Sequence, residues 1–216
     1  MTTDNDTQQK QQQPGAQTDG ADKTDSEKAQ ELIAAVHWNG LQALKMEFGE
    51  QQVEGQVMNH EVYGPIFTYM VKSPEGKSYV SGFFLREMIA GFQQKQDPSL
   101  WLSSFYVDLM KSPESRLLPM PPQSEEEAKA LIDKIIVPHC VNSVREEFAP
   151  EPVHADLELH EEHGPVVEAG FPSITEGNNV CAMPLHFLMA HYLLNRDPAD
   201  LLIQGLYRIR EEHGLD

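Results

Sequence analysis

Imidazole and carboxylate side chains alternate along one short stretch in the C-terminal part of the chain. The stretch contains His154, Asp156, Glu158 and His160, and it is followed by Glu161, Glu162 and His163. If residues 153–160 form a β-strand, side chains two positions apart lie on one face at intervals of roughly 6.5–7 Å. Imidazole and carboxylate together suit zinc or another borderline divalent ion, provided that an adjacent strand supplies further ligands. The sequence therefore offers one candidate metal site, made of His154, Asp156, Glu158, His160 and His163.

The same pattern is typical of the solvated face of an edge strand in an acidic protein, and we favour this interpretation. One hundred residues earlier, the corresponding positions hold Glu54, Gln56, Met58 and His60. The ligand-type side chains are thus present only once, which argues against a duplicated catalytic site. We predict no resident cofactor, with zinc or another divalent metal as the alternative.

A His-Glu pair at positions 60–61 recurs at 160–161, and Gly-Pro follows it at 64–65 and 164–165. Zinc-protease helices need a second histidine four positions after the first, so that both imidazoles share a face. Here the fourth position is Gly64 or Gly164, so that comparison fails. We predict instead that the Glu or His side chain bonds backbone groups in the turn before Gly-Pro.

No other pattern indicates catalysis. His139 and Cys140 suggest a thiolate–imidazole pair, but neighbours in sequence seldom face one another. No P-loop, G-x-S-x-G or G-x-G-x-x-G pattern accompanies them. We therefore predict no catalytic residue. The methionines Met58, Met70, Met88, Met183 and Met189 are typical of ordinary core, with an adaptable apolar groove as the alternative.

The elements that position these residues repeat with a period of one hundred. Residues 45–110 aligned without gaps on 145–210 give 14 identical pairs in 66. Matching capping boxes at Thr24 and Ser124 predict a helix at the start of each unit. Strands are expected at 53–60 and 153–160, 66–71, 77–81 and from Val180, with turns between them. Pro138 should kink or break the second long helix near Val137.

The predicted fold is therefore α+β, a tandem duplication of an α-β-β-β-α-α unit. Each unit is a small antiparallel sheet with helices on one face. Such a sheet is marginal alone, so the units should pack as an intrachain pseudo-dimer. We expect a disordered polar tail over residues 1–23, one unit over 24–111, a proline-rich linker over 112–123 and the second unit over 124–216.

Charge and cysteine usage restrict the partners and the compartment. Sixteen Lys and Arg against 34 Asp and Glu give a formal charge of −18. This field repels phosphate backbones and anionic membranes, so we predict neither nucleic acid nor membrane as a partner. A protein or peptide partner fits this charge better, and a basic partner would complement it. Two cysteines without a paired spacing and no long apolar run indicate a cytoplasmic location.

The order of elements and the acidic charge resemble those of the small acidic chaperones of bacterial secretion systems. The similarity lies in architecture and charge and includes no sequence motif. We therefore expect a non-enzymatic acidic protein-binding module, chaperone-like or an adaptor, that presents sheet edges or an apolar groove to a partner. One alternative is a metal-dependent hydrolase or metal-binding protein that uses residues 154–163. Another is a structural or regulatory subunit of a larger assembly, and the oligomeric state stays open.

Overall fold

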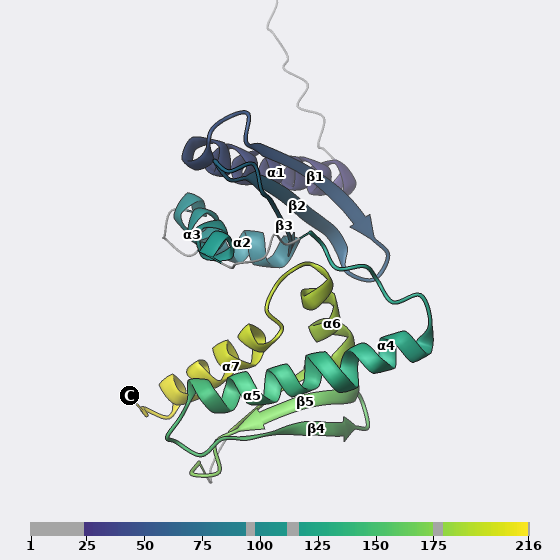
Figure 1. Ribbon diagram of the computed structural model, residues 1–216, viewed down its shortest axis with the longest axis vertical. Coiled ribbons are helices and arrows are strands. Elements are labelled where there is room, and N and C mark those ends of the chain that lie inside the picture. Colours follow the sequence, from purple (N-terminus) through teal and green to yellow (C-terminus); the bar gives the residue numbers. More distant parts are fainter. Residues whose placement is uncertain (1–23, 94–97, 112–116, 175–178, 216) are drawn as a thin grey trace, which may run out of the picture.

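The computed structural model describes residues 24–93, 98–111, 117–174 and 179–215. The predicted polar tail and the first part of the predicted linker lie outside these residues. Two three-stranded antiparallel sheets lie in the two halves of the chain, each with helices packed against it (Figure 1), so the predicted α+β class is confirmed. Within the described residues, no helix has the length and apolar character needed to cross a membrane.

The N-terminal half, up to residue 111, is built around the sheet β1-β2-β3. Its elements are α1 (Asp25–Phe48), β1 (Val53–His60), β2 (Gly64–Lys72), β3 (Ser78–Phe84), α2 (Leu85–Gln93) and α3 (Pro98–Lys111). Alternate residues of β2 and β3 meet α1 and α3 in one hydrophobic core, since side chains on a strand point to opposite faces in turn. The largest buried members of this core are Leu44, Phe67, Tyr69, Phe83, Met88, Leu102 and Tyr106.

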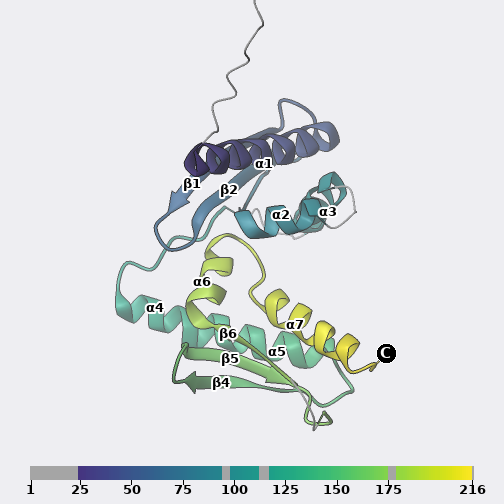
Figure 2. The ribbon, with the colours of Figure 1, turned by 180° about the vertical axis from the view of Figure 1, so that it is seen from behind.

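The C-terminal half, from residue 124, is built around the sheet β4-β5-β6. Its elements are α4 (Glu125–Leu131), the π-helical turn η1 (Ile132–Ile136), α5 (Val137–Glu147), β4 (His154–His160), β5 (Gly164–Gly170), β6 (Val180–Pro184), α6 (Leu185–Leu193) and α7 (Ala199–Glu212). α5 and α7 pack on one face of the sheet, as both views of the ribbon show (Figures 1 and 2). The core of this half includes Ile136, Cys140, Val144, Val167, Phe171, Leu188, Leu202 and Leu206.

The capping box predicted at Thr24 is confirmed, and the one predicted at Ser124 is found only in part. Thr24 and Glu27 form the full capping box: the Glu27 N–H donates to Thr24 Oγ1 and the Thr24 N–H to Glu27 Oε2. Ser124 Oγ accepts the Glu127 N–H at 3.1 Å, but the Glu127 carboxylate accepts the N–H of Gln123 instead. The second helix therefore keeps its cap and lacks the reciprocal bond of a box.

Pro138 alters the second long helix without breaking it. α4, η1 and α5 run on as one helix in Figure 1. The π turn comes directly before Pro138, where the helix must accommodate a ring and a missing N–H. One wider turn is a known way to absorb such a disturbance. The predicted break near Val137 is thus a local change of helix type.

The first hairpin of each sheet closes in the same register. His60 lies opposite Gly64, and His160 lies opposite Gly164. The two glycines have φ values of 70° and 69°, a left-handed conformation that other residues adopt at a cost. The turn itself consists of residues 61–63 and 161–163, and each Gly-Pro pair opens the following strand.

The two halves meet through α6. One side of this helix contributes to the core of its own half, and the other packs on the N-terminal sheet, on the face opposite α1 and α3. The contact is a small apolar cluster of Ile66, Phe84, Ala190 and Leu194, flanked by Tyr63 and Phe187.

The segment between α6 and α7 also pairs with the outer edge of β3. The Gly82 N–H donates to the Leu194 carbonyl at 2.9 Å, and Asn195 Nδ2 donates to the Val80 carbonyl at 2.8 Å. Asn195 adopts a φ of 60°, which asparagine tolerates better than most residues. The edge of β3 is therefore used inside the chain and is not free for a partner.

Candidate functional site

The residues of the predicted metal site lie on β4 and in the turn that follows it. His154, Asp156 and Glu158 are exposed on the face of the sheet opposite α5 and α7, and His160 is partly buried beside them. His160 Nε2 lies 3.2 Å from Glu168 Oε2 on the neighbouring strand. The rings of His160 and His163 are 6.4 Å apart between centroids. The sequence thus identified the residues that share this face.

The same side chains do not converge on a point. Asp156 Oδ1 accepts the backbone N–H of Leu157 at 2.7 Å, and His160 is paired with Glu168. Among the residues that the structure describes, no three His, Cys, Asp or Glu side chains lie close enough to hold a metal ion. The metal site stays a prediction, and His160 of the predicted site is already paired with Glu168 on β5.

The His-Glu pair of the N-terminal half has the structural role expected of it. His60 Nδ1 accepts the backbone N–H groups of Val62 at 3.1 Å and Tyr63 at 3.4 Å. The imidazole therefore caps the turn between β1 and β2. In the C-terminal half, His160 contacts Glu168 instead, so the two copies differ in this detail.

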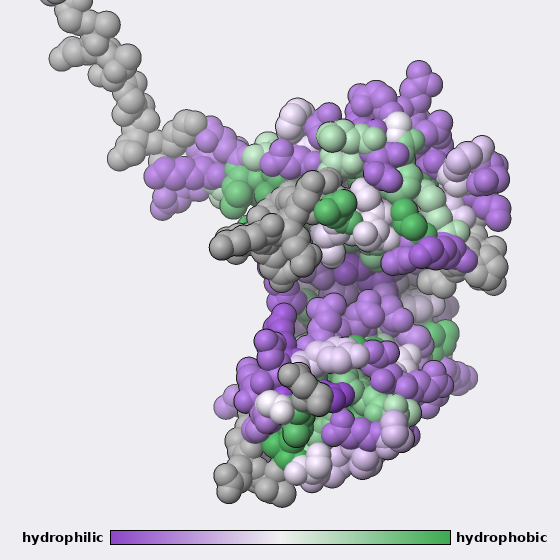
Figure 3. All heavy atoms as spheres, turned by 90° about the vertical axis from the view of Figure 1, so that its left-hand side faces the viewer, coloured by the Kyte–Doolittle hydropathy of each residue, from purple (hydrophilic) through white to green (hydrophobic). Residues whose placement is uncertain are grey.

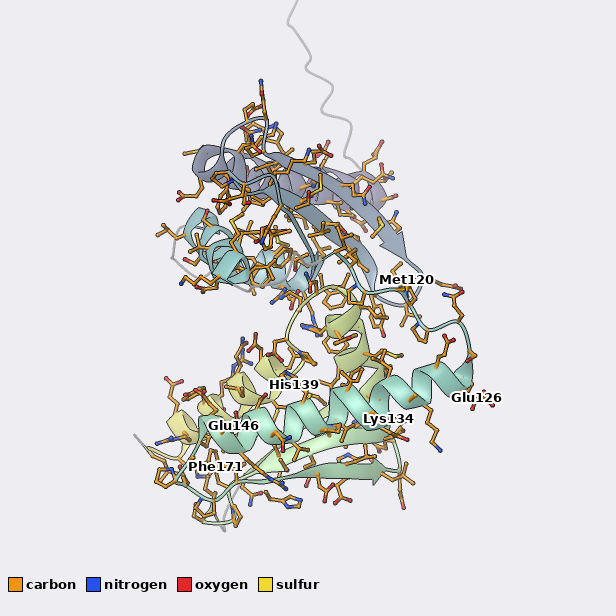
Figure 4. All side chains as sticks on the ribbon, viewed as in Figure 1. Met120, Glu126, Lys134, His139, Glu146 and Phe171 are labelled. Carbon is orange, nitrogen blue, oxygen red and sulfur yellow. The ribbon has the colours of Figure 1, made fainter. Side chains whose placement is uncertain are left out.

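His139 and Cys140 point in different directions from α5. Cys140 is fully buried in the core, and burial raises the pKa of its thiol to about 12. His139 is exposed on α5 (Figure 4), and its Nε2 lies 2.7 Å from Asp197 Oδ1. Asp197 also accepts the Ala199 N–H at the start of α7. The pair therefore ties α5 to the beginning of α7, a contact across 58 positions that no local pattern could reveal.

The outer edge of β4 is the side that faces away from β5. Within the described part of the chain, β4 pairs only with β5. The Ala155 carbonyl accepts a hydrogen bond from Arg145 Nη2 on α5, so it points away from β5. Because outward-facing residues alternate along an antiparallel strand, the backbone groups of Leu157 and Leu159 point the same way. The Leu157 and Leu159 side chains are 41% and 79% exposed, which leaves two large apolar groups on an open edge.

The predicted methionines are divided between the two cores and the surface. Met88 is buried in the N-terminal core, whereas Met183 and Met189 pack against the C-terminal core. Met58 on β1 is 40% exposed. The edge of β4 is therefore the better candidate for a docking surface.

A second candidate site is a cleft of about 630 Å³ between α2 of the N-terminal half and α7 of the C-terminal half. Its polar lining comes from both halves and includes Arg86, Glu87, His191, Arg196, Asp200, Gln204 and Arg208. Seen from the side on which α3 and α7 lie, the surface is hollowed between two lobes and is hydrophilic there (Figure 3).

Arg196 and Glu87 line this cleft and form an ion pair between the two halves. The Arg196 guanidinium carbon lies 4.7 Å from the ring centroid of Phe83 and 5.1 Å from that of Phe105. Its Nη1 is 3.4 Å from Glu87 Oε2, which also accepts the Phe84 N–H at 2.9 Å. A residue of the C-terminal half is thereby fixed between two rings of the N-terminal half.

His191 is buried beside this pair. Its residue exposure is 1%, and its Nε2 lies 3.5 Å from Glu87 Oε1 without forming a hydrogen bond. Burial, with the positive charges of Arg196 and Arg86, lowers the pKa of His191 to about 3. Glu87 acts in the opposite direction, but its charge is shared with Arg196. His191 is therefore neutral at pH 7.

Comparison with known proteins gives no family. No protein-family model, curated protein or solved structure matches the chain significantly. The edge of β4 and the cleft are therefore the two features of the molecule that bear on its function.

Proposed function

We propose that the protein is a non-enzymatic binding module that takes up an extended segment of a partner protein at the outer edge of β4. The observation that carries the proposal is an unpaired edge strand with two exposed leucines, Leu157 and Leu159. An open edge of this kind is a template for a further strand, and natural proteins normally blunt it. Binding by strand addition uses the main chain for affinity and alternate side chains for specificity.

The edge is protected only in part. The Ala155 carbonyl already accepts a hydrogen bond from Arg145, and the Leu157 N–H already donates to the Asp156 side chain. The Leu157 carbonyl and both backbone groups of Leu159 remain outward. An incoming strand would begin at these groups and displace the Asp156 side chain from the Leu157 N–H.

The two faces of β4 define the chemistry of the partner. Leu157 and Leu159 lie on one face, and Asp156 and Glu158 lie on the other, with Glu168 opposite Asp156 on β5. A strand added beside β4 would place its own side chains alternately on these faces. With a chain charge of −18, the partner segment that fits alternates apolar residues with Lys or Arg.

A peptide-display selection against the whole protein tests this proposal. Enriched peptides should alternate apolar and basic residues. Leu159→Pro should abolish their binding, because proline removes an outward N–H and leaves the bonds to β5 intact. The matched control is Asn59→Pro in β1. Its N–H also points away from β2, since Gln52 and Lys72 form a hydrogen-bonded pair and the pattern alternates from there.

Two results would contradict the proposal. One is enrichment of peptides without alternation. The other is equal binding by the Leu159→Pro variant, or loss of binding in the Asn59→Pro variant instead. Circular dichroism of both variants separates loss of the edge from loss of the fold.

We further propose that the halves are tandem copies, with units at 24–111 and 124–216 joined by 112–123, packed as an intrachain pseudo-dimer. The support is that buried positions recur one hundred residues apart. The recurring pairs are Val36 and Ile136, Leu44 and Val144, Phe67 and Val167, Met88 and Leu188, Leu102 and Leu202, and Leu109 and Ile209. A protease site inserted in the linker tests the packing: the cleaved fragments should elute together, and separate elution would contradict it.

A further inference from the structure

The cleft between α2 and α7 is lined by three arginines and two acidic residues, Glu87 and Asp200, in a strongly acidic protein. Three of the six arginines of the chain, Arg86, Arg196 and Arg208, line it. Arg86 comes from the N-terminal half, and the other two come from the C-terminal half. Acidic residues outnumber basic ones by 34 to 16 overall, so this grouping is against the trend of the composition.

Two of these guanidinium groups are available for a ligand. Among the described residues, neither Arg86 nor Arg208 forms a salt bridge with a carboxylate. Arg86 is held with its guanidinium carbon 4.2 Å from the ring centroid of Phe187, which restricts its orientation. Glu87 does not neutralise them, because it is already engaged by Arg196 and by the Phe84 N–H.

Buried polar atoms on the same wall lack partners. Among the described residues, His191 Nε2 and Arg196 Nε have no hydrogen-bond partner. His191 is almost completely buried, with a residue exposure of 1%. Buried polar groups are normally satisfied by protein, water or ligand. Both residues line the cleft, with these two atoms buried just behind its surface.

We propose that this cleft binds a small organic anion with two negative charges, carried by carboxylate or phosphate groups. Arg86 on α2 and Arg208 on α7 hold the anion from opposite walls, because guanidinium groups recognise both kinds of oxyanion through paired hydrogen bonds. Trp101, Met183 and Leu201 offer contact to an apolar body. Since the walls belong to different halves, the ligand holds the halves together and stabilises the folded chain.

Tryptophan fluorescence gives a direct assay. The chain has two tryptophans, of which Trp101 lines the cleft and Trp38 is 61% exposed on α1. In a Trp38→Phe background, Trp101 alone reports binding. The probes are phenyl phosphate and isophthalate, which separate phosphate from carboxylate recognition, and benzamide as a neutral control. We expect saturable binding of at least one dianion and none of benzamide.

Charge-matched variants decide whether the cleft is responsible. Arg86→Gln and Arg208→Gln should each weaken binding tenfold or more, as expected for loss of a charged hydrogen-bonded contact. Lys134→Gln on η1 (Figure 4) removes the same charge outside the cleft and should leave affinity unchanged. Arg86→Lys and Arg208→Lys, which keep charge but lose the planar fork, should bind more weakly than wild type and serve if the glutamine variants do not fold.

Three outcomes would overturn the proposal. The first is that neither dianion binds saturably. The second is that affinity falls in only one of the two arginine variants or in neither. The third is that affinity falls equally in the Lys134→Gln variant. The first excludes a site, the second excludes a clamp from opposite walls, and the third indicates only the general field of the chain. None of them bears on peptide binding at β4, which is measured separately.

Discussion

The side chain of Leu194 lies directly over Gly82, so that a Cβ at position 82 would stand 2.5 Å from Leu194 Cδ2. A new side-chain rotamer of Leu194 would not remove the clash, because its Cβ would also lie 3.3 Å away and its carbonyl, which accepts the Gly82 N–H, holds its backbone in place. We expect Gly82→Ala to lower the free energy of unfolding by about 1–3 kcal/mol, the usual range for overpacking. Urea denaturation measures this loss.

Gly91→Ala is the matched control for that substitution. A Cβ at position 91 would lie 3.4 Å from Trp101 Cε3, which is ordinary contact, and Gly91 is in the interior of α2. Alanine there should leave stability unchanged or raise it by up to about 1 kcal/mol. Equal effects at both positions would show that the Leu194 contact is unimportant.

Asn195 provides a second test of the contact between the halves. Asn195→Gly keeps the left-handed backbone and removes the bond from Nδ2 to the Val80 carbonyl, so we expect a loss of about 1 kcal/mol. Asn195→Ala removes the same bond and also strains the backbone, which should cost about 1–2 kcal/mol more. Urea denaturation of both variants separates the two effects. Equal stability of the two variants would contradict the backbone argument.

Local signals in the sequence account for most elements of the fold. The helix caps at Thr24 and Ser124 are decided by a few neighbouring residues and follow from the sequence, although Ser124 lacks the reciprocal bond of the predicted box. Gly64 and Gly164 were expected to mark a turn, but their left-handed conformation was not predicted. The contact between Leu194 and Gly82 joins positions 112 residues apart, so no local pattern carries it. Pro138 is an intermediate case. The proline predicts that the helix is altered near this position, but the formation of a π turn instead of a break depends on how the helix packs on the rest of the chain.

The candidate sites were predictable to different degrees. Alternation placed Asp156 and Glu158 correctly on one face of β4. A strand that alternates in this way normally buries its apolar face, whereas only Ala155 is buried there and Leu157 and Leu159 are exposed. The alternation of a strand does not say how far the covering helix extends. The cleft had no sequence signal, because its arginines come from separate segments of both halves.

The pair of Arg196 and Glu87 gives a third prediction. Arg196→Met should lower the free energy of unfolding by about 3 kcal/mol, because it leaves the mostly buried Glu87 carboxylate without its cation. Combining it with Glu87→Gln should restore part of the loss. A double-mutant cycle in urea measures the coupling, which we expect at about 1–3 kcal/mol. Strictly additive effects would show that the two charges do not interact.

Metal analysis tests the remaining alternative for β4. His160 is paired with Glu168, and Asp156 is bonded to the Leu157 N–H, so we expect no stoichiometric zinc in protein purified without chelator. The wild type should show the same unfolding curve with and without added zinc, as should a His154→Ala, His160→Ala double variant. Stoichiometric zinc that is absent from the double variant would instead support the metal-binding alternative.

The buried imidazole of His191 predicts how stability depends on pH. Burial, with Arg196 and Arg86 nearby, lowers the pKa of His191 to about 3 in the folded chain, against about 6.5 when unfolded. Between these values the unfolded chain binds a proton that the folded chain does not, so stability falls as pH falls. From pH 7.5 to 5.5, His191 should lower the free energy of unfolding by about 1.4 kcal/mol. His37, whose pKa is also lowered by burial, acts in the same direction.

The contribution of His191 can be isolated with a His191→Gln variant, which does not titrate in this range and can still contact Glu87. Urea denaturation of both proteins at pH 7.5, 6.5 and 5.5 gives the difference, from which His37 and the carboxylates cancel. We expect the wild-type curve to fall more steeply than that of the variant over this range. Parallel curves would mean that His191 gains a proton as readily in the folded chain as in the unfolded one, and that Glu87 therefore compensates its burial.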